Sequence, residues 1–363
     1  MSSVLVQGAG AVSPAGWGRD ALIRAVQRGV PLPADALTEP GFQRHPPSRR
    51  VPTPGAPPVF ARHPRFRRAS PITHFAMAAC LEALGGTAAT TAWAGRRMGI
   101  VVGVHTGSIQ YSTRFFGEVL QDPATASPLL FPETVFNAPA SHIAAFLGGH
   151  PLTCTLVGDE TAFLQALAFG ANWLRQDRVD LCLVIGAEEA SLLVADALRH
   201  FTSTTIPAEG AGAVLLGKPS PATAGVELAL VTAPRTYAGS TSRDAAALAM
   251  RRDLPPERPG ELLVDSRGGC PRRDRAETAA WAGWTGDRLS PRAILGQALC
   301  AASAWQLVIA WDWLNHGQAA AANVSLVGSN QQALATRLER VGTTPMTVGL
   351  ESRAATLNPH PDP

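Results

Sequence analysis

The chain has 363 residues, of which 46% are hydrophobic and 16% charged, and its formal net charge is +3. Soluble domains ordinarily contain about 25% charged residues, so this composition excludes a disordered chain and favours a large buried interface. Because the positive charge is small, we predict no nucleic-acid partner. The length suffices for two domains, or for one large domain built of two parts.

Cysteine usage indicates a reducing compartment. Cys80, Cys154, Cys182, Cys270 and Cys300 are scattered, without the paired spacing of a zinc site. We therefore expect free thiols, no metal and a cytoplasmic protein. No apolar run reaches the about 20 residues that span a bilayer, so no membrane segment is predicted.

Short runs rich in β-branched residues and leucine alternate with helical patterns, which predicts an α/β fold. In chain order, strands are predicted at 4–7, 99–104, 152–157, 181–185, 213–216, 226–231, 262–265, 323–327 and 346–350. Helices are predicted at 18–27, 73–84, 133–147, 161–175, 191–201 and 297–314.

Two of these helices, 161–174 and 298–314, have almost no polar face and must be buried between layers. A five-layer α/β/α/β/α sandwich of two similar halves provides such a place, with one buried helix from each half. We assign residues 1–220 to the N-terminal half and 221–357 to the C-terminal half. Residues 358–363 are predicted to be a disordered tail.

Residues 31–70 are rich in proline and arginine and are predicted to form an extended surface arm. Two interpretations of its charge stay open: a solvated loop, or a docking surface for an acidic partner. The arginines are Arg44, Arg49, Arg50, Arg62, Arg65, Arg67 and Arg68.

The first strand is followed by Gly8-x-Gly10, a spacing that also begins dinucleotide-binding sites. Here Ser13 and Pro14 replace the third glycine, and the proline-rich arm stands where a second strand should end in an acidic residue. We therefore predict no nucleotide and no other cofactor.

Several segments resemble those of β-ketoacyl synthases and follow in that family's order. They are the first strand and turn, 68–71 with the helix after it, 99–103, 127–132, 137–143, 148–153, 180–188, 209–213 and 323–330. This resemblance implies the thiolase fold and a dimer.

The resemblance also shows which residues occupy the family's catalytic positions. The nucleophilic cysteine at the start of the first buried helix is matched by Glu160. Arg267 and Gln297 match the two histidines, and Arg292 matches the lysine. Decarboxylative condensation needs a thiolate and imidazoles, so we do not expect this chain to perform it alone.

Glu160 has two open interpretations. As a structural residue, it interacts with the helix dipole and pairs with Arg267 or Arg292. As a functional residue, it acts as a carboxylate or carboxylic acid on a thioester or malonyl group.

A synthase framework without its cysteine resembles the chain length factors, the β subunits of type II polyketide ketosynthases. This resemblance implies a heterodimer with an active ketosynthase α subunit, an acyl carrier protein as a further partner and a polyketide chain in a shared tunnel. The carrier protein is expected to dock on Arg49, Arg50, Arg65, Arg67 and Arg68. The tunnel and chain-length residues would be Ile109, Tyr111, Phe115, Phe116 and Phe163, although Tyr111 and Phe115 also have the spacing of core packing.

The edge strand 152–157 is expected to pair across the dimer. Two alternatives remain. One is a stand-alone decarboxylase or acyltransferase that uses Glu160 with Arg267 as its electrostatic partner. The other is a homodimer that binds an acyl chain without chemistry.

Overall fold

The computed structural model describes residues 3–38, 43–86, 95–200, 202, 204–219, 225–329 and 331–342. In the first half, five strands lie in the order β1-β8-β7-β5-β6, and in the second half five lie in the order β9-β14-β13-β11-β12. Antiparallel pairing between β1 and β9 joins the two sets at Leu5 and Val6. Numbered along the chain, the strands of each half take the spatial order 1-5-4-2-3, so the two halves repeat one topology.

The strands of the first half are β1 (Leu5–Ser13), β5 (Met98–Val104), β6 (Leu152–Val157), β7 (Leu181–Glu188) and β8 (Gly210–Gly217). Those of the second half are β9 (Gly225–Val231), β11 (Leu262–Val264), β12 (Asp287–Leu289), β13 (Ala321–Val327) and β14 (Gln332–Val341). Short strands β2 (Gly16–Trp17) and β10 (Arg235–Thr236) extend the sheets, and β3 (Asp35–Ala36) pairs with β4 (Pro47–Ser48).

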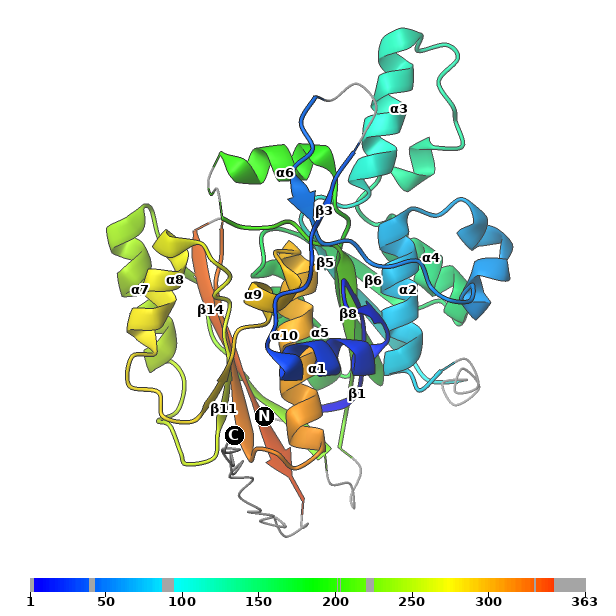
Figure 1. Ribbon diagram of the computed structural model, residues 1–363. Helices are drawn as coiled ribbons and strands as arrows, with labels where there is room; N and C mark the ends of the chain where they lie inside the picture. Colours follow the sequence, from blue (N-terminus) through cyan, green and yellow to red (C-terminus); the bar gives the residue numbers. More distant parts are fainter. Residues whose placement is uncertain are drawn as a thin grey trace, which may run out of the picture.

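The helices form three layers around these sheets (Figure 1). Helices α5 (Ala162–Arg175) and α10 (Leu299–Asn315) lie in the middle, between the two sheets. Helices α2 (Pro71–Ala83) and α4 (Ala138–Leu147) cover the first sheet from outside, and α7 (Ser240–Arg252) and α8 (Pro271–Ala280) cover the second. The expected five-layer thiolase fold is therefore confirmed.

Four further helices complete the fold: α1 (Arg19–Arg28), α3 (Ile109–Gln121), α6 (Leu192–Arg199) and α9 (Pro291–Leu295). The predicted boundary at residue 220 falls between β8 and β9, outside the described residues, as do the tail 358–363 and the predicted strand 346–350. The last described strand is β14, which the sequence patterns did not predict. They also did not predict the helices α3, α7 and α8. Among the described residues, no helix has the length and apolar character needed to cross a bilayer.

The proline-rich arm differs from the expected extended surface segment. Residues Val59–Arg62 and Pro64–Arg67 form two short 3₁₀ helices, and their Phe60 and Phe66 are buried. Phe66 packs against Phe60 and Phe146 with ring centroids 5.1 and 5.7 Å apart. These aromatic contacts hold the basic end of the arm against the first half.

Helix α10 is attached to the first sheet by hydrogen bonds from two of its tryptophans. The indole of Trp305 donates to the carbonyl oxygens of Val12 and Ala211, at 3.0 Å each. The indole of Trp311 donates to the carbonyl oxygen of Val6 at 2.9 Å. A helix with no polar face thus still satisfies its buried donors.

The close approach of α10 to β7 requires glycine at position 186. A Cβ atom on Gly186 would overlap the carbonyl oxygen of Cys300 and lie 2.9 Å from the Cβ atom of Ala304. Neither neighbour can rotate away, because one is backbone and the other has no flexible end.

We predict that Gly186→Ala lowers the free energy of unfolding by about 1–3 kcal/mol, because the added methyl forces α10 from the sheet. Urea denaturation followed by circular dichroism measures this loss. Gly117→Ala in α3 is the matched control, since a Cβ there meets no atom within 4 Å. Alanine favours helix over glycine, so the control should be neutral or stabilising. Equal losses in both variants would contradict the packing argument.

Candidate functional site

Glu160 lies in the turn between β6 and α5, one residue before the N-cap Thr161, and its side chain is fully buried. Its Oε1 accepts hydrogen bonds from the guanidinium of Arg273 at 2.9 Å and from the amide of Gln297 at 2.6 Å. The hydroxyl of Ser329 donates to the same oxygen at 2.7 Å, and the backbone N–H of Ser329 donates to Oε2 at 2.8 Å. Arg292 adds a longer contact of 3.4 Å. Five donors therefore surround one carboxylate.

These donors come from four places in the second half of the chain. Arg273 lies in α8, Arg292 in α9, Gln297 directly before α10, and Ser329 directly after β13. Glu160 belongs to the first half. The cluster therefore joins the two halves at the point where their middle helices begin.

Two positive charges determine the protonation state of Glu160. Burial by itself raises the pKa of this carboxyl, but the charges of Arg273 and Arg292 and the hydrogen bonds from Ser329 outweigh it and lower the pKa to about 2. At neutral pH the group is a carboxylate whose oxygens are occupied by donors. It has no proton to give and is poorly placed to accept one or to act as a nucleophile.

A glycine allows Ser329 to reach this carboxylate. A Cβ atom on Gly328 would overlap Oδ2 of Asp159. Asp159 in turn fixes the start of α5, since its Oδ1 accepts from the backbone N–H of Thr161 at 2.9 Å and from the Thr161 hydroxyl at 2.5 Å. The turn after β13 and the turn before α5 are thus in direct contact.

Three of the four residues predicted at catalytic positions meet at this site, namely Glu160, Arg292 and Gln297. Arg267 does not pair with Glu160. Its Nε donates to Oδ2 of the buried Asp265 at 2.7 Å, and a second nitrogen donates to the hydroxyl of Ser290 at 3.1 Å. The expected pairing of Glu160 with Arg267 or Arg292 is therefore correct for Arg292 and wrong for Arg267, because Asp265 holds Arg267.

Arg273 and Ser329 were not recognised from the sequence as partners of Glu160. No sequence pattern distinguishes Arg273 from the other arginines of α8, and its burial together with Glu277, four residues later, is seen only in the structure. Glu277 accepts from the backbone N–H and hydroxyl of Ser266, at 3.1 and 2.6 Å, and from the hydroxyl of Ser325 at 2.6 Å. Burial, and then the charge of Asp265, raises its pKa to about 7.

One thiol lies beside the cluster. Cys300, in the first turn of α10, donates from Sγ to the carbonyl oxygen of Asp159 at 3.1 Å. Burial raises its pKa well above the ordinary value, so the thiolate needed for acyl transfer is not formed there at neutral pH. Cys300 is far from Glu160 in sequence, and reading the residues adjacent to Glu160 does not reveal this proximity.

The five predicted tunnel residues fall into two groups. Ile109, Tyr111, Phe115 and Phe116 lie on α3, where no residue is buried in the isolated chain. Figure 1 shows α3 projecting from the body of the molecule. Phe163 lies instead in α5 and is fully buried in the main core.

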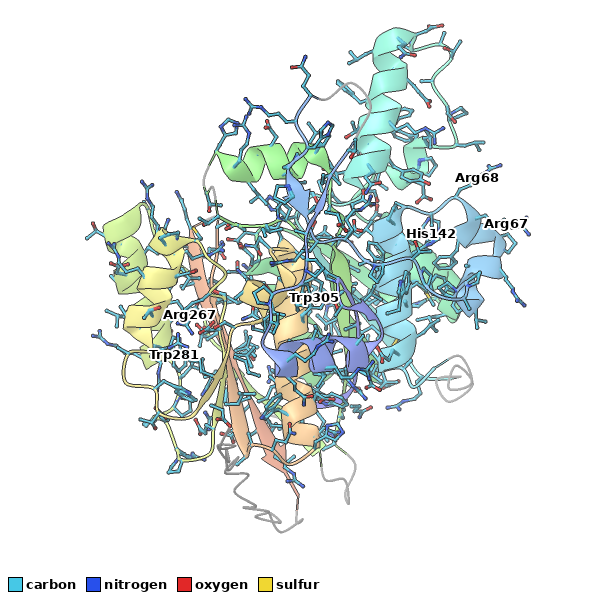
Figure 2. The ribbon with its side chains drawn as sticks, viewed as in Figure 1. Arg67, Arg68, His142, Arg267, Trp281 and Trp305 are labelled. Atoms are coloured by element: carbon cyan, nitrogen blue, oxygen red, sulfur yellow. The ribbon has the colours of Figure 1, made fainter. Side chains whose placement is uncertain are left out.

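The arginines predicted to dock the carrier protein differ in exposure and in their partners. Arg49 is buried and donates from Nε to the carbonyl oxygen of Leu32 at 2.8 Å, while Arg50 pairs with Glu209 at 3.3 Å. Arg65, Arg67 and Arg68 are exposed, and Figure 2 shows Arg67 and Arg68 pointing away from the body of the molecule. Arg50 also stays accessible, since its side chain is 51% exposed, so Arg49 alone of the five is withdrawn from a partner.

Apolar side chains are exposed on two elements of the first half, α3 and β6. On α3, Phe116 and Leu120 are 62% and 72% exposed. On β6, the outermost strand of the first sheet, Leu152 and Val157 are 37% and 55% exposed. A sheet edge of this kind is a place where another chain can add a strand.

The family model described as "Beta-ketoacyl synthase, N-terminal domain" matches residues 1–222. No curated protein matches the chain. Three solved structures have the same fold at identities too low to carry more than the fold. Each aligns with 94% of this chain.

The ishigamide ketosynthase/chain length factor has a TM-score of 0.75 and 20% identity, with 100% of that chain covered. A β-ketoacyl synthase from Burkholderia phymatum STM815 has a TM-score of 0.75 and 17% identity, with 100% covered. The ketosynthase ApeO in complex with its chain length factor ApeC, from Xenorhabdus doucetiae, has a TM-score of 0.74 and 13% identity, with 98% covered.

We predict that Glu160→Gln destabilises the chain at neutral pH by an amount of the order of 3 kcal/mol, because the pKa near 2 stabilises the folded carboxylate relative to the unfolded one. A lowered pKa contributes stability above the unfolded value near 4.5, and this contribution is lost as the pH falls toward 2. The difference between wild type and variant should therefore shrink over that range.

Urea unfolding of both proteins between about pH 7 and about pH 3 measures this difference. Asp196→Asn is the control, because Asp196 forms an exposed surface pair with Arg199 that solvent screens, and its loss should change the stability little at any pH in this range. A Glu160→Gln effect that does not change with pH would contradict the ionised state assigned to Glu160.

Proposed function

The chain belongs to the β-ketoacyl synthase family, and within it we propose a chain length factor, a non-catalytic subunit that pairs with an active ketosynthase and shapes the tunnel for the growing polyketide. The partner ketosynthase would supply the cysteine and the condensation chemistry.

The observation that carries this proposal is the state of Glu160. A ketosynthase needs a thiolate at this position and an open space in which a thioester is held. Here a carboxylate replaces the thiol, and five donors occupy its two oxygens. A residue bound in this way supports the structure between the two halves and is unsuited to acyl transfer.

The alternative of a stand-alone enzyme is poorly supported by the same contacts. A decarboxylase or acyltransferase using Glu160 would need a carboxyl that titrates near neutral pH or is open to substrate, and this one has a pKa of about 2. Its proposed electrostatic partner, Arg267, is engaged with Asp265.

The exposed apolar side chains favour an obligate partner. Helix α3 exposes Phe116 and Leu120 in its second half and buries none of its residues, although an isolated soluble chain ordinarily covers apolar surface. The edge strand β6 offers backbone pairing, as expected for residues 152–157. A ketosynthase subunit that covers both would bury this surface and bring α3 to the shared tunnel, with Phe116 among the residues that reach the partner.

An acyl carrier protein is the expected second partner. Arg65, Arg67 and Arg68 are exposed and make no ion pair with a described acidic residue, so their charge is available to an acidic surface. Arg49 is not proposed as a docking residue, because it is buried and its Nε donates to a carbonyl oxygen within the chain. Arg50 stays in the proposal, since its side chain is 51% exposed although its Nε pairs with Glu209. Phe163, in turn, is a core residue and is no longer proposed to line a tunnel.

We predict that co-expression with its active ketosynthase α subunit gives a 1:1 heterodimer and that elongation of malonyl carrier protein depends on this chain. Size exclusion and product analysis with and without the chain measure both. Purified heterodimer carrying Glu160→Gln should still support elongation, since Glu160 has no chemical role.

A homodimer that consumes malonyl thioester by itself, with turnover lost in Glu160→Gln, would show that Glu160 is catalytic. A homodimer that retains an acyl ligand and has no turnover would instead indicate a binding protein. Native mass spectrometry separates these two outcomes from the heterodimer.

Phe116→Ala is predicted to lengthen the polyketide, because a smaller side chain at the tunnel end leaves room for further two-carbon units. Mass spectrometry of the products from the reconstituted heterodimer measures the change. Leu248→Ala on the outer helix α7 is the control, since Leu248 is also an exposed apolar residue but lies on the opposite side of the molecule. An unchanged product from a folded Phe116→Ala heterodimer would remove Phe116 from the chain-length residues.

A further inference from the structure

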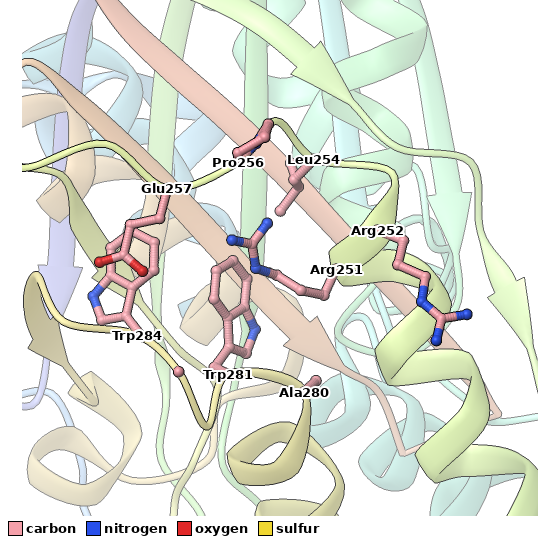
Figure 3. A pocket seen from close by; sticks show the side chains of 9 residues that line it. Arg251, Arg252, Leu254, Pro256, Glu257, Ala280, Trp281 and Trp284 are labelled. Carbon is pink, nitrogen blue, oxygen red and sulfur yellow. The ribbon is translucent and has the colours of Figure 1, made fainter.

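A cavity of about 410 Å³ opens on the outer face of the second half (Figure 3). It lies where α7 ends and α8 ends, and the loop after α7 closes one side. The main lining residues are Arg251, Arg252, Leu254, Glu257, Trp281 and Trp284. Arg273, which binds Glu160, is seven residues before Ala280 on α8, or about 10 Å along the helix. The cavity is thus separate from the Glu160 cluster.

Two tryptophans form a rigid wall of this cavity. Trp281 is buried and donates from its indole to the hydroxyl of Ser325 at 2.9 Å. Trp284 donates from its indole to the carbonyl oxygen of Asp287 at 3.1 Å. The two rings meet edge to face with centroids 5.3 Å apart. Because both indoles are fixed by hydrogen bonds, the wall is formed before any ligand arrives.

A positive charge lies against this wall. The guanidinium of Arg251 sits over the ring of Trp281, 4.5 Å from its centroid, and donates to the carbonyl oxygen of Pro255 at 3.1 Å. Arg251 forms no ion pair with a described carboxylate, although the charges of Glu257 and Glu261 act on it at longer range. Arg252 stands at the rim and, in Figure 3, points away from the tryptophans. The positions of both arginines at the end of α7 suit the helix dipole, but that does not account for the tryptophan wall beside them.

An acceptor completes the cavity. Oε1 of Glu257 is held by the backbone N–H and hydroxyl of Thr285, at 2.8 and 2.7 Å, and by the backbone N–H of Gly286 at 3.0 Å. Among the described residues, its Oε2 has no hydrogen-bond donor. The cavity therefore combines an aromatic wall, a cation and a carboxylate oxygen that can accept a donor.

We propose that this cavity is a binding site for a small aromatic acid that also carries a hydroxyl group. The carboxylate of the ligand would meet Arg251, its ring would pack against Trp284, and its hydroxyl would donate to Oε2 of Glu257. The volume lies in the range of sites for small molecules, which begins at about 300 Å³. The proposal is independent of the chain length factor assignment, because none of these residues lies on α3, on β6 or at Glu160.

The test is titration calorimetry with 4-hydroxybenzoate on the purified chain and on its heterodimer. The expected Kd is about 0.1–1 mM, as suits a small ligand with few polar contacts. Benzoate, which lacks the hydroxyl, and phenol, which lacks the carboxylate, should each bind several-fold more weakly. Binding to the chain without its partner keeps this test separate from any elongation assay.

Arg251→Gln should weaken 4-hydroxybenzoate at least about tenfold, and Trp284→Leu should weaken all three ligands. Arg275→Gln is the matched control, because Arg275 is an exposed arginine of α8 outside the cavity lining. Circular dichroism checks that each variant is folded. Absence of binding at about 10 mM, or equal binding in wild type and a folded Arg251→Gln variant, would overturn the proposal.

Discussion

A single buried carboxylate determines how the two halves of this protein meet. Glu160 comes from the first half, and all five of its donors come from the second. An uncompensated buried charge costs several kcal/mol, so the segments that carry the donors must be in place once Glu160 is buried. The start of α5, the end of β13 and the approach to α10 are thereby fixed together.

The ion pairs of Glu160 act on helices whose positions are already limited by apolar packing. Helices α5 and α10 have apolar side chains on every face, so each needs a sheet on both sides. Close contacts of α10 with the first sheet then depend on small residues such as Gly186, while Trp305 and Trp311 satisfy their indoles on backbone carbonyls of β1 and β8. The apolar layers set where the helices lie, and the charge cluster sets how their first turns face each other.

The architecture could be predicted from the sequence because the buried helices lack a polar face, a pattern that few folds accommodate.

Prediction from the sequence failed where charged residues are buried in pairs. Strand β14 looks polar because Arg337 and Glu339 lie within it, yet Arg337 is buried and forms an ion pair with Glu261 at 2.5 Å. Arg273 was missed for the same reason: nothing in a charge-rich segment shows which arginine faces inward. The resemblance to β-ketoacyl synthases selected Glu160, Gln297 and Arg292, which do meet in the structure. It also selected Arg267, which pairs with Asp265 instead.

The residues around Glu160 are chemically interdependent. A cysteine introduced at position 160 would by itself leave Arg273 and Arg292 buried beside a neutral thiol, with the largest part of their compensating charge removed. Their charges would lower the pKa of such a thiol, but no imidazole would stand at positions 267 and 297 to stabilise an enolate or oxyanion. Removing the arginines while keeping Glu160 would instead bury a carboxylate that Gln297 and Ser329 still hydrogen-bond but that no positive charge compensates. Each single change at this cluster therefore costs stability, which gives the ion-paired arrangement a physical reason to persist.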